Sequence, residues 1–172
     1  PAWKKQLFFF FFRSRQGAHP LARWFYEALV FRTIKAKLGG RLRFVVSGGA
    51  SLDRKIAKFF QTIGLPILEG YGLTETSPVV AVNRLEATKI GTVGLLLPGV
   101  EVTIDKEKQI LIRGRNVMKG YYEQPELTQE VIDSEGWFHS GDMGFIDSEG
   151  YLTVIGRIKE LIVLTNGKKV NP

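Results

Sequence analysis

The stretch RFVVSGGASLDRKIAKFFQTIGLPILEGYGLTE, residues 43–75, decides the fold of this chain. Residues 43–47 form a short apolar and β-branched run, which predicts a buried strand. Residues 66–68 form a second short apolar run, and a helical segment lies between the two. A strand, a helix and a strand at this spacing predict part of a parallel α/β sheet.

The helix between the two strands is predicted to open at Ser51 or Leu52 and to run to about Thr62. Asp53 falls in its predicted first turn, where the helix dipole favours an acid. Gly64 is predicted to end the helix. A further helix is predicted upstream, over residues 20–38, from apolar residues at helical spacing.

Residues 69–75 follow the second strand and read Glu69-Gly70-Tyr71-Gly72-Leu73-Thr74-Glu75, predicted to be a loop. Glycines let the backbone approach a ligand closely, and an aromatic ring such as Tyr71 can stack on a flat base or cap an apolar wall. The Thr74 hydroxyl can donate to a phosphate oxygen, and the Glu75 carboxylate can hold Mg²⁺. Taken alone, the pattern also fits a turn with a polar end that binds nothing.

Two glycine-containing segments are predicted to follow the carboxyl ends of strands. These are Ser47-Gly48-Gly49 and the loop that contains Tyr71. In open α/β sheets this edge is where ligands bind.

After residue 88 the pattern changes to short β-rich runs separated by Gly, Pro and charged residues. The runs cover residues 91–94, 100–104, 109–113 and 151–155, and a short helix is predicted from Pro125 to Ile132. This half predicts a small antiparallel sheet or a partial barrel.

Composition sets outer limits on the class of protein. The chain has 172 residues, of which 44% are hydrophobic, enough for one packed domain or parts of two. It has no cysteine, which excludes disulfides and thiolate metal sites and suits a reducing, cytoplasmic compartment. His19 and His139 have no His or Cys at ligand spacing, which argues against a transition-metal site.

Positive charge is concentrated at the start of the chain. Residues 1–43 hold ten Lys or Arg and one acid, Glu27, a local charge of +9, so the remainder carries −2. Beside the apolar run from Leu7 to Phe12, this basic segment could make peripheral contact with an anionic membrane surface. The sequence favours the alternative of a solvated basic face on an otherwise buried helix. No pattern typical of nucleic-acid binding is present.

Several motifs occur in a fixed order along the chain, together with the 69–75 stretch. They are Ser47-Gly48-Gly49-Ala50, Gly91-Thr92-Val93-Gly94, Pro98-Gly99, Ile112-Arg113-Gly114, Val117-Met118-Lys119-Gly120-Tyr121-Tyr122, Trp137-Phe138-His139-Ser140-Gly141-Asp142 and Gly156-Arg157-Ile158-Lys159-Glu160. In this order they resemble the motifs of the adenylate-forming enzymes, that is, the AMP-forming acyl-CoA synthetases and their relatives. The tail from Leu161 to Lys169 is most similar to the long-chain fatty acid branch.

The resemblance implies a reaction in two steps. A fatty acid carboxylate attacks the α-phosphate of ATP and gives acyl-AMP and pyrophosphate, and the thiol of coenzyme A then displaces AMP. It also implies that Tyr71 packs on adenine, with Gly48, Gly49 and Ala50 as the opposite wall and with Glu69, Gly70 and Gly72 beside the same nucleotide. Thr74 would contact the α-phosphate, and Glu75 would hold Mg²⁺.

Three positions near the end of the chain complete the set that the resemblance implies. Asp142 would accept both ribose hydroxyls and Arg157 would reach the same ribose. Lys159 would be the hinge of a mobile C-terminal domain. From the residues alone, the sequence favours a turn-forming role for Asp142 and a surface ion pair of Arg157 with Asp147 or Glu160, and the motif matches favour the ribose instead. Tyr121 and Tyr122 are predicted to be structural.

The resemblance also predicts the organisation of the chain as an α/β protein. Residues 1–88 would be the end of a parallel α/β nucleotide-binding subdomain, 89–157 a β-rich, barrel-like subdomain, and 158–172 the hinge and the start of the C-terminal domain. The family's phosphate loop and C-terminal lysine have no counterpart in the chain, so the 172-residue chain alone is expected to be inactive.

Two alternatives stay open. One is a sibling activity, an acyl-carrier-protein synthetase or an acyl-AMP ligase. The other is a non-catalytic remnant that binds nucleotide or a membrane surface.

Overall fold

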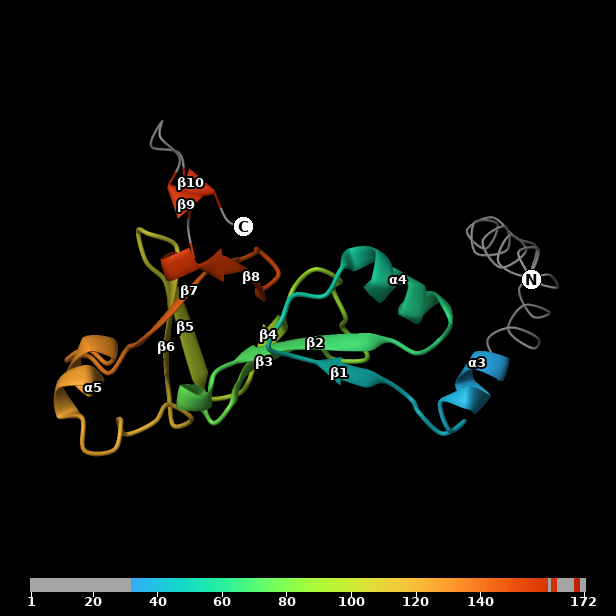
Figure 1. Ribbon diagram of the computed structural model, residues 1–172, viewed down its shortest axis with the longest axis horizontal. Coiled ribbons are helices and arrows are strands. Elements are labelled where there is room, and N and C mark those ends of the chain that lie inside the picture. The colour runs from blue at the N-terminus through green and yellow to red at the C-terminus, as the bar shows by residue number, and fades with distance from the viewer. Residues whose placement is uncertain (1–31, 161, 164–168, 171–172) are drawn as a thin grey trace. The chain divides into compact units, whose positions relative to one another are not determined.

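The structure is a computed structural model that describes residues 32–160, 162–163 and 169–170 (Figure 1). The basic segment beside Leu7 to Phe12 and the first part of the predicted 20–38 helix lie outside the described residues. None of the helices that are described is long and apolar enough to cross a membrane.

The described residues fall into two compact units. One contains residues 32–45 and 59–66, and the other contains residues 46–58 and those from 67 onward. The units share the helix α4 and the strand β1, because the division falls inside each of these elements.

The first unit has a small apolar core. Ile63 and Leu65, each 1% exposed, form its centre. The side chains packed against them are Ile34 from helix α3 (Arg32–Lys37), Val45 from β1 (Val45–Ser47), and Phe59 and Phe60 from α4 (Arg54–Thr62).

Helix α4 confirms the helix predicted between the first two strands, but it begins later than predicted. Asp53 precedes the helix, and its Oδ1 accepts hydrogen bonds from the backbone N–H groups of Lys55 (2.7 Å) and Ile56 (3.2 Å). The acid is therefore the N-cap and not a first-turn residue. The predicted end is confirmed, because Gly64 has a φ of +73° and follows the last turn.

The main body of the second unit is a β-sheet. The eight strands of the sheet lie in the order β1-β2-β3-β4-β8-β7-β6-β5, and the neighbouring pairs from β2 to β5 are antiparallel. The strands after β1 are β2 (Ile67–Gly72), β3 (Val79–Val82), β4 (Gly94–Leu96), β5 (Val100–Ile104), β6 (Gln109–Gly114), β7 (Phe138–Ile146) and β8 (Tyr151–Arg157). The mixed α/β class is thus confirmed.

Alternation of buried and exposed side chains explains which strands the sequence predicted. β5, β6 and β8 match the predicted runs, and the helix α5 (Pro125–Val131) begins at Pro125 as expected. The strand nearest to the predicted run 91–94 is β4, which begins only at Gly94 and ends at Leu96. β3 and β7 were not predicted.

The second strand is longer than predicted. β2 continues to Gly72, so Glu69, Gly70 and Tyr71 lie on a strand and not in a loop. Gly70 pairs with Val82 and Tyr71 with Ala81 of β3, and this antiparallel pairing extends the strand through the motif. A short 3₁₀ turn, η2 (Thr74–Thr76), follows.

The core of the second unit is formed by side chains from the strands of this sheet. It is built from the buried residues Val80, Ala81, Ile110, Ile112, Phe138 and Leu152. These residues come from β3, β6, β7 and β8, so the core fixes the strands that carry the motifs.

The chain ends in a turn and two short strands. The 3₁₀ turn η3 (Ile158–Glu160) contains Lys159, directly after β8. β9 (Ile162–Val163) pairs antiparallel with β10 (Lys169–Val170).

Candidate nucleotide-binding site

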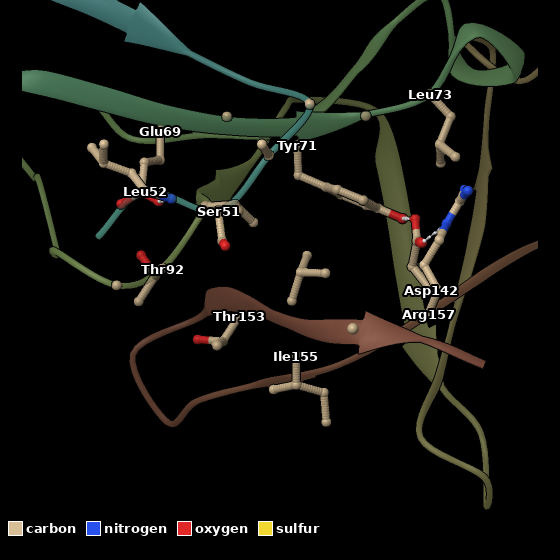
Figure 2. A pocket seen from close by; sticks show the side chains of 18 of the residues that line it. Ser51, Leu52, Glu69, Tyr71, Leu73, Thr92, Asp142, Thr153, Ile155 and Arg157 are labelled. Carbon is tan, nitrogen blue, oxygen red and sulfur yellow. Dashed lines mark hydrogen bonds and ion pairs between the residues drawn. The ribbon is translucent and has the colours of Figure 1, made fainter. Parts of the chain in front are cut away.

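A cavity of about 810 Å³ lies within the second unit (Figure 2). It is lined by residues 49–54 except 53, by 69–73 at the end of β2, by 91–93, by Asp142 of β7 and by 153–157 of β8. This volume lies in the range of typical small-molecule pockets. Among the residues that the sequence singled out, Gly49, Ala50, Glu69, Gly70, Tyr71, Gly72, Asp142 and Arg157 share this one cavity.

Asp142 is held at one end of the cavity by two partners. The Tyr71 hydroxyl donates to Asp142 Oδ2 at 2.8 Å, and Arg157 Nε donates to Oδ1 at 2.7 Å (Figure 2). Asp142 is 6% exposed, so its charge is balanced by these charge-assisted contacts rather than by bulk water. The sequence alternative of an ion pair between Arg157 and Asp147 is not what the structure shows, since Asp147 pairs with Lys89 instead.

Strand pairing places this carboxylate. Asp142 and Arg157 are direct partners in the antiparallel register of β7 and β8. The backbone N–H of Asp142 donates to Ser140 Oγ at 3.1 Å, and Ser140 Oγ in turn donates to the Ile110 carbonyl at 2.7 Å. The Asp142 backbone is therefore tied to β6 through Ser140, and its side chain is held by Tyr71 from β2 and by Arg157 from β8.

The Tyr71 hydroxyl stays protonated at neutral pH. Burial raises the pKa of Tyr71 well above its ordinary value, and the neighbouring Asp142 carboxylate raises it further. The phenol is therefore a stable donor to Asp142, and the ring lines the cavity.

Glu69 and Gly49 also line the cavity. Glu69 is 9% exposed, and its Oε1 accepts a hydrogen bond of 3.3 Å from the backbone N–H of Leu52, which ties β2 to the segment after β1. Gly49 has a φ of +82°, a conformation that favours glycine, and a Cβ added there would point into open space. This part of the cavity wall thus depends on backbone geometry at Gly49 and on the buried carboxylate of Glu69.

The remaining predicted site residues lie outside the lining of the cavity. Gly48, Thr74, Glu75 and Lys159 are not among its lining residues. Thr74 and Glu75 lie on η2, immediately after the lining residue Leu73. Their assignment to phosphate and to metal stays a prediction.

Glu75 has a partner that sequence analysis assigned only a structural role. The Tyr121 hydroxyl donates to Glu75 Oε1 at 3.0 Å. Leu52, Thr92 and Thr153 also line the cavity, and none of the three was assigned a site role from the sequence. The signals that could have selected Tyr121 and Thr92 were their places in the Val117–Tyr122 and Gly91–Gly94 motifs, whereas Leu52 and Thr153 lie in no motif.

The cavity offers the chemistry that a nucleoside needs. An aromatic face, apolar side chains such as Val93 and Ile155, and a buried carboxylate with an adjacent guanidinium all meet there. A carboxylate can accept hydrogen bonds from a vicinal diol, and the flat face of Tyr71 suits a base.

Comparison with known proteins identifies the family of the chain. Residues 15–122 match the family described as AMP-binding enzyme. A long-chain-fatty-acid–CoA ligase, FadD15 of Mycobacterium bovis, is 44% identical over 147 residues, which are 86% of this chain and 24% of that protein. The chain therefore spans about a quarter of the length of this curated relative.

Solved structures show the same fold. MatB from Rhodopseudomonas palustris has a TM-score of 0.67 at 34% identity, over 79% of this chain and 29% of that chain. O-succinylbenzoate coenzyme A synthetase (MenE) from Bacillus subtilis, in complex with ATP and magnesium ion, has a TM-score of 0.68 at 26% identity, over 82% of this chain and 33% of that chain. From the family match and these structural similarities, the chain belongs to the AMP-binding enzyme family.

Proposed function

We propose that this chain supplies the nucleotide-binding centre of an AMP-forming fatty acid–CoA ligase. The observation that carries the proposal is the buried Asp142 carboxylate, held between Tyr71 and Arg157 at one end of a cavity. In a chain of the AMP-binding enzyme family, this arrangement suits the ribose and base of ATP and of an acyl adenylate.

The described contacts give each residue a role in this proposal. Tyr71 would offer its ring face to adenine while its hydroxyl keeps Asp142 in place. Asp142 would accept the ribose hydroxyls, because each carboxylate oxygen can accept a second hydrogen bond beside the one it already has. Arg157, with a side chain 52% exposed, would reach toward the same sugar from the rim.

Thr74 and Glu75 would serve the phosphate end of the nucleotide. They follow the cavity directly along the chain, so a nucleotide seated at Tyr71 would extend its phosphates toward η2. Within the described part of the chain, no three His, Cys, Asp or Glu side chains gather into a metal cluster. A single carboxylate at Glu75 still fits Mg²⁺, which takes most of its ligands from water and phosphate. When bound, Mg²⁺ would neutralise charge on the phosphates.

The substrates proposed are ATP, a long-chain fatty acid and coenzyme A. The relative FadD15 is named as a long-chain-fatty-acid–CoA ligase, and its 44% identity to this chain supports the fatty acid as the acyl substrate. The fatty acid carboxylate would attack the α-phosphate and release pyrophosphate, and the thiol of coenzyme A would then attack the acyl carbon and release AMP. Neither step changes an oxidation state.

The test is product analysis with the complete ligase that contains this chain. Fatty acid, ATP and Mg²⁺ should give fatty-acid-dependent exchange of pyrophosphate into ATP, and adding coenzyme A should give AMP and the thioester in equal amounts. Formation of ADP and phosphate, or no exchange with any fatty acid, would refute the proposal. Thioester formation on an acyl carrier protein but not on coenzyme A would establish the sibling activity instead.

A further inference from the structure

The main chain at Glu75 is fixed by contacts that do not involve its carboxylate. Thr76 is fully buried. Its Oγ1 accepts a hydrogen bond from the Leu73 N–H at 2.9 Å and can donate its one proton to the Leu73 or the Pro78 carbonyl, each 3.0 Å away. The Met118 N–H donates to the Glu75 carbonyl at 2.8 Å. The 3₁₀ turn is therefore held in place whatever the Glu75 side chain does.

A second segment of the chain reinforces this turn. Asn116 Nδ2 donates to the Thr76 carbonyl at 3.1 Å and lies 3.4 Å from the Val79 carbonyl. Asn116 and Met118 both lie in the segment after β6, and both donate hydrogen bonds to backbone carbonyls of η2.

The Glu75 side chain is oriented separately, by Tyr121. A glutamate has three rotatable side-chain bonds, so a fixed backbone does not fix its carboxylate. The Tyr121 hydroxyl donates to Oε1 at 3.0 Å and thereby selects one arrangement of that group. Among the described residues, Tyr121 is the hydrogen-bond partner of the Glu75 carboxylate.

Tyr121 is itself anchored by helix α5. Its backbone N–H donates to Thr128 Oγ1 at 2.9 Å, and Thr128 Oγ1 donates to the Gln124 carbonyl at 2.9 Å. Gly120 permits this approach, since a Cβ there would lie 2.8 Å from the Thr128 side chain. A hydrogen-bonded chain therefore runs from α5 through Tyr121 to Glu75.

We infer that Tyr121 is a positioning residue that presents the Glu75 carboxylate to a divalent cation bound with the nucleotide. The inference rests on the proposed function, in which Glu75 is the protein ligand of Mg²⁺. The phenol engages Oε1, and Oε2 would then be the oxygen available to the cation. Mg²⁺ demands near-octahedral geometry with short bonds, so a pre-oriented oxygen binds it better than a rotating one.

A tyrosine suits this task because it orients the Glu75 carboxylate without neutralising its charge. The neutral hydroxyl leaves the full negative charge of Glu75 available to the cation, whereas a lysine or arginine would compete with it. A phenol is neutral at physiological pH, so Tyr121 can donate to Glu75 without carrying a charge.

The adjacent tyrosine provides a matched control. Tyr122 is 87% exposed, whereas Tyr121 is 36% exposed and bonded to Glu75. Tyr121→Phe and Tyr122→Phe therefore remove one hydroxyl each, from neighbouring positions, and keep both rings.

The experiment measures metal binding directly in the complete ligase. Mn²⁺, observed by electron paramagnetic resonance, is titrated into protein saturated with a non-hydrolysable ATP analogue, and the Mg²⁺ dependence of pyrophosphate exchange is measured in parallel. Tyr121→Phe should raise the Mn²⁺ dissociation constant and the Mg²⁺ concentration for half-maximal exchange by about 3- to 10-fold. The rate at saturating Mg²⁺ should change less than the half-maximal concentration, and Tyr122→Phe should match wild type.

Two further variants separate failure of this inference from failure of the proposed function. Glu75→Gln should weaken Mn²⁺ binding more than Tyr121→Phe, and Thr128→Val should weaken it in the same direction but less. If Glu75→Gln weakens binding while Tyr121→Phe equals Tyr122→Phe, the positioning role is overturned and the metal role of Glu75 stands. If Glu75→Gln binds Mn²⁺ like wild type, the metal role itself is wrong.

Discussion

The hydroxyl of Tyr71 and Oδ2 of Asp142 lie 2.8 Å apart, although the two residues are separated by 71 positions in the chain. This hydrogen bond links the ring that lines one wall of the cavity to the carboxylate at its end. Arg157 fixes the other carboxylate oxygen at 2.7 Å. In the proposed function, the groups that would face the base and the sugar are thus oriented before a nucleotide enters, which would lower the ordering cost of binding.

The Tyr71–Asp142 contact predicts a change in stability at alkaline pH. Burial, reinforced by Asp142, raises the pKa of Tyr71, so the folded protein holds this proton more tightly than the unfolded chain, whose tyrosines titrate near pH ~10. The contribution of the protonated Tyr71 hydroxyl to the free energy of unfolding is therefore complete below about pH 10 and is lost as the pH rises above it. Urea unfolding from pH 9 to 12 should show a shallower alkaline decline for Tyr71→Phe than for wild type. Tyr122→Phe is the control, and parallel curves for Tyr71→Phe and wild type would contradict the prediction.

Two glycines of the motifs should differ sharply in their tolerance of a methyl group. A Cβ at Gly72 would overlap the carbonyl oxygen of Pro78, whereas a Cβ at Gly48 would meet the Gly70 oxygen at 3.5 Å, an ordinary contact. Gly72→Ala should lower the free energy of unfolding by about 1–3 kcal/mol or more, because backbone must move. Gly48→Ala should fold nearly as well as wild type. Urea unfolding of the two variants tests this difference in stability. Equal midpoints would show that the contact between Gly72 and the Pro78 carbonyl is not tight.

A proline at Lys159 should separate the two half-reactions of the complete ligase. Lys159 is exposed and lies in η3, directly after the strand that supplies Arg157. Proline fixes φ near −65° and removes a backbone donor, so a hinge at this position could not change conformation. Lys159→Pro should reduce thioester formation more than pyrophosphate exchange. Equal losses in both assays would place the hinge elsewhere.

Much of the fold follows from local sequence signals. The helix α4 was predicted between two short apolar runs, with its end at a glycine, Gly64. The strands β5, β6 and β8 were predicted from short β-rich runs between turn residues. Each of these signals lies within one short segment of the chain. Where local preference and tertiary packing agree, sequence is sufficient.

The missed elements are those that tertiary pairing imposes. β7 contains Ser140, Gly141 and Asp142, whose polar and flexible character does not predict a strand. Pairing with β6 on one side and β8 on the other makes it the longest strand described, at nine residues. In the same way, pairing with β3 turns the glycine-rich residues 69–72 from a predicted loop into strand.

The candidate site shows the same division. The motif resemblance selected Tyr71, Asp142 and Arg157 as one group, and the structure brings them into contact. It did not predict the hydrogen bond between Tyr121 and Glu75, because the residues are 46 positions apart and neither shows a local pattern of pairing. Contacts of this kind depend on strand order, which no single segment encodes.

The most direct test of the account is the affinity of the complete ligase for a non-hydrolysable acyl-AMP mimic, measured by isothermal titration with wild type and Asp142→Ala. The substitution removes the proposed ribose acceptor, and hydrogen bonds to a charged group are worth roughly 1.5–3 kcal/mol each, so the dissociation constant should rise at least about tenfold. Glu135→Ala, which removes an exposed carboxylate outside the cavity, should bind like wild type. An Asp142→Ala variant that is folded and binds the mimic as tightly as wild type would contradict the assignment of this cavity to the nucleotide.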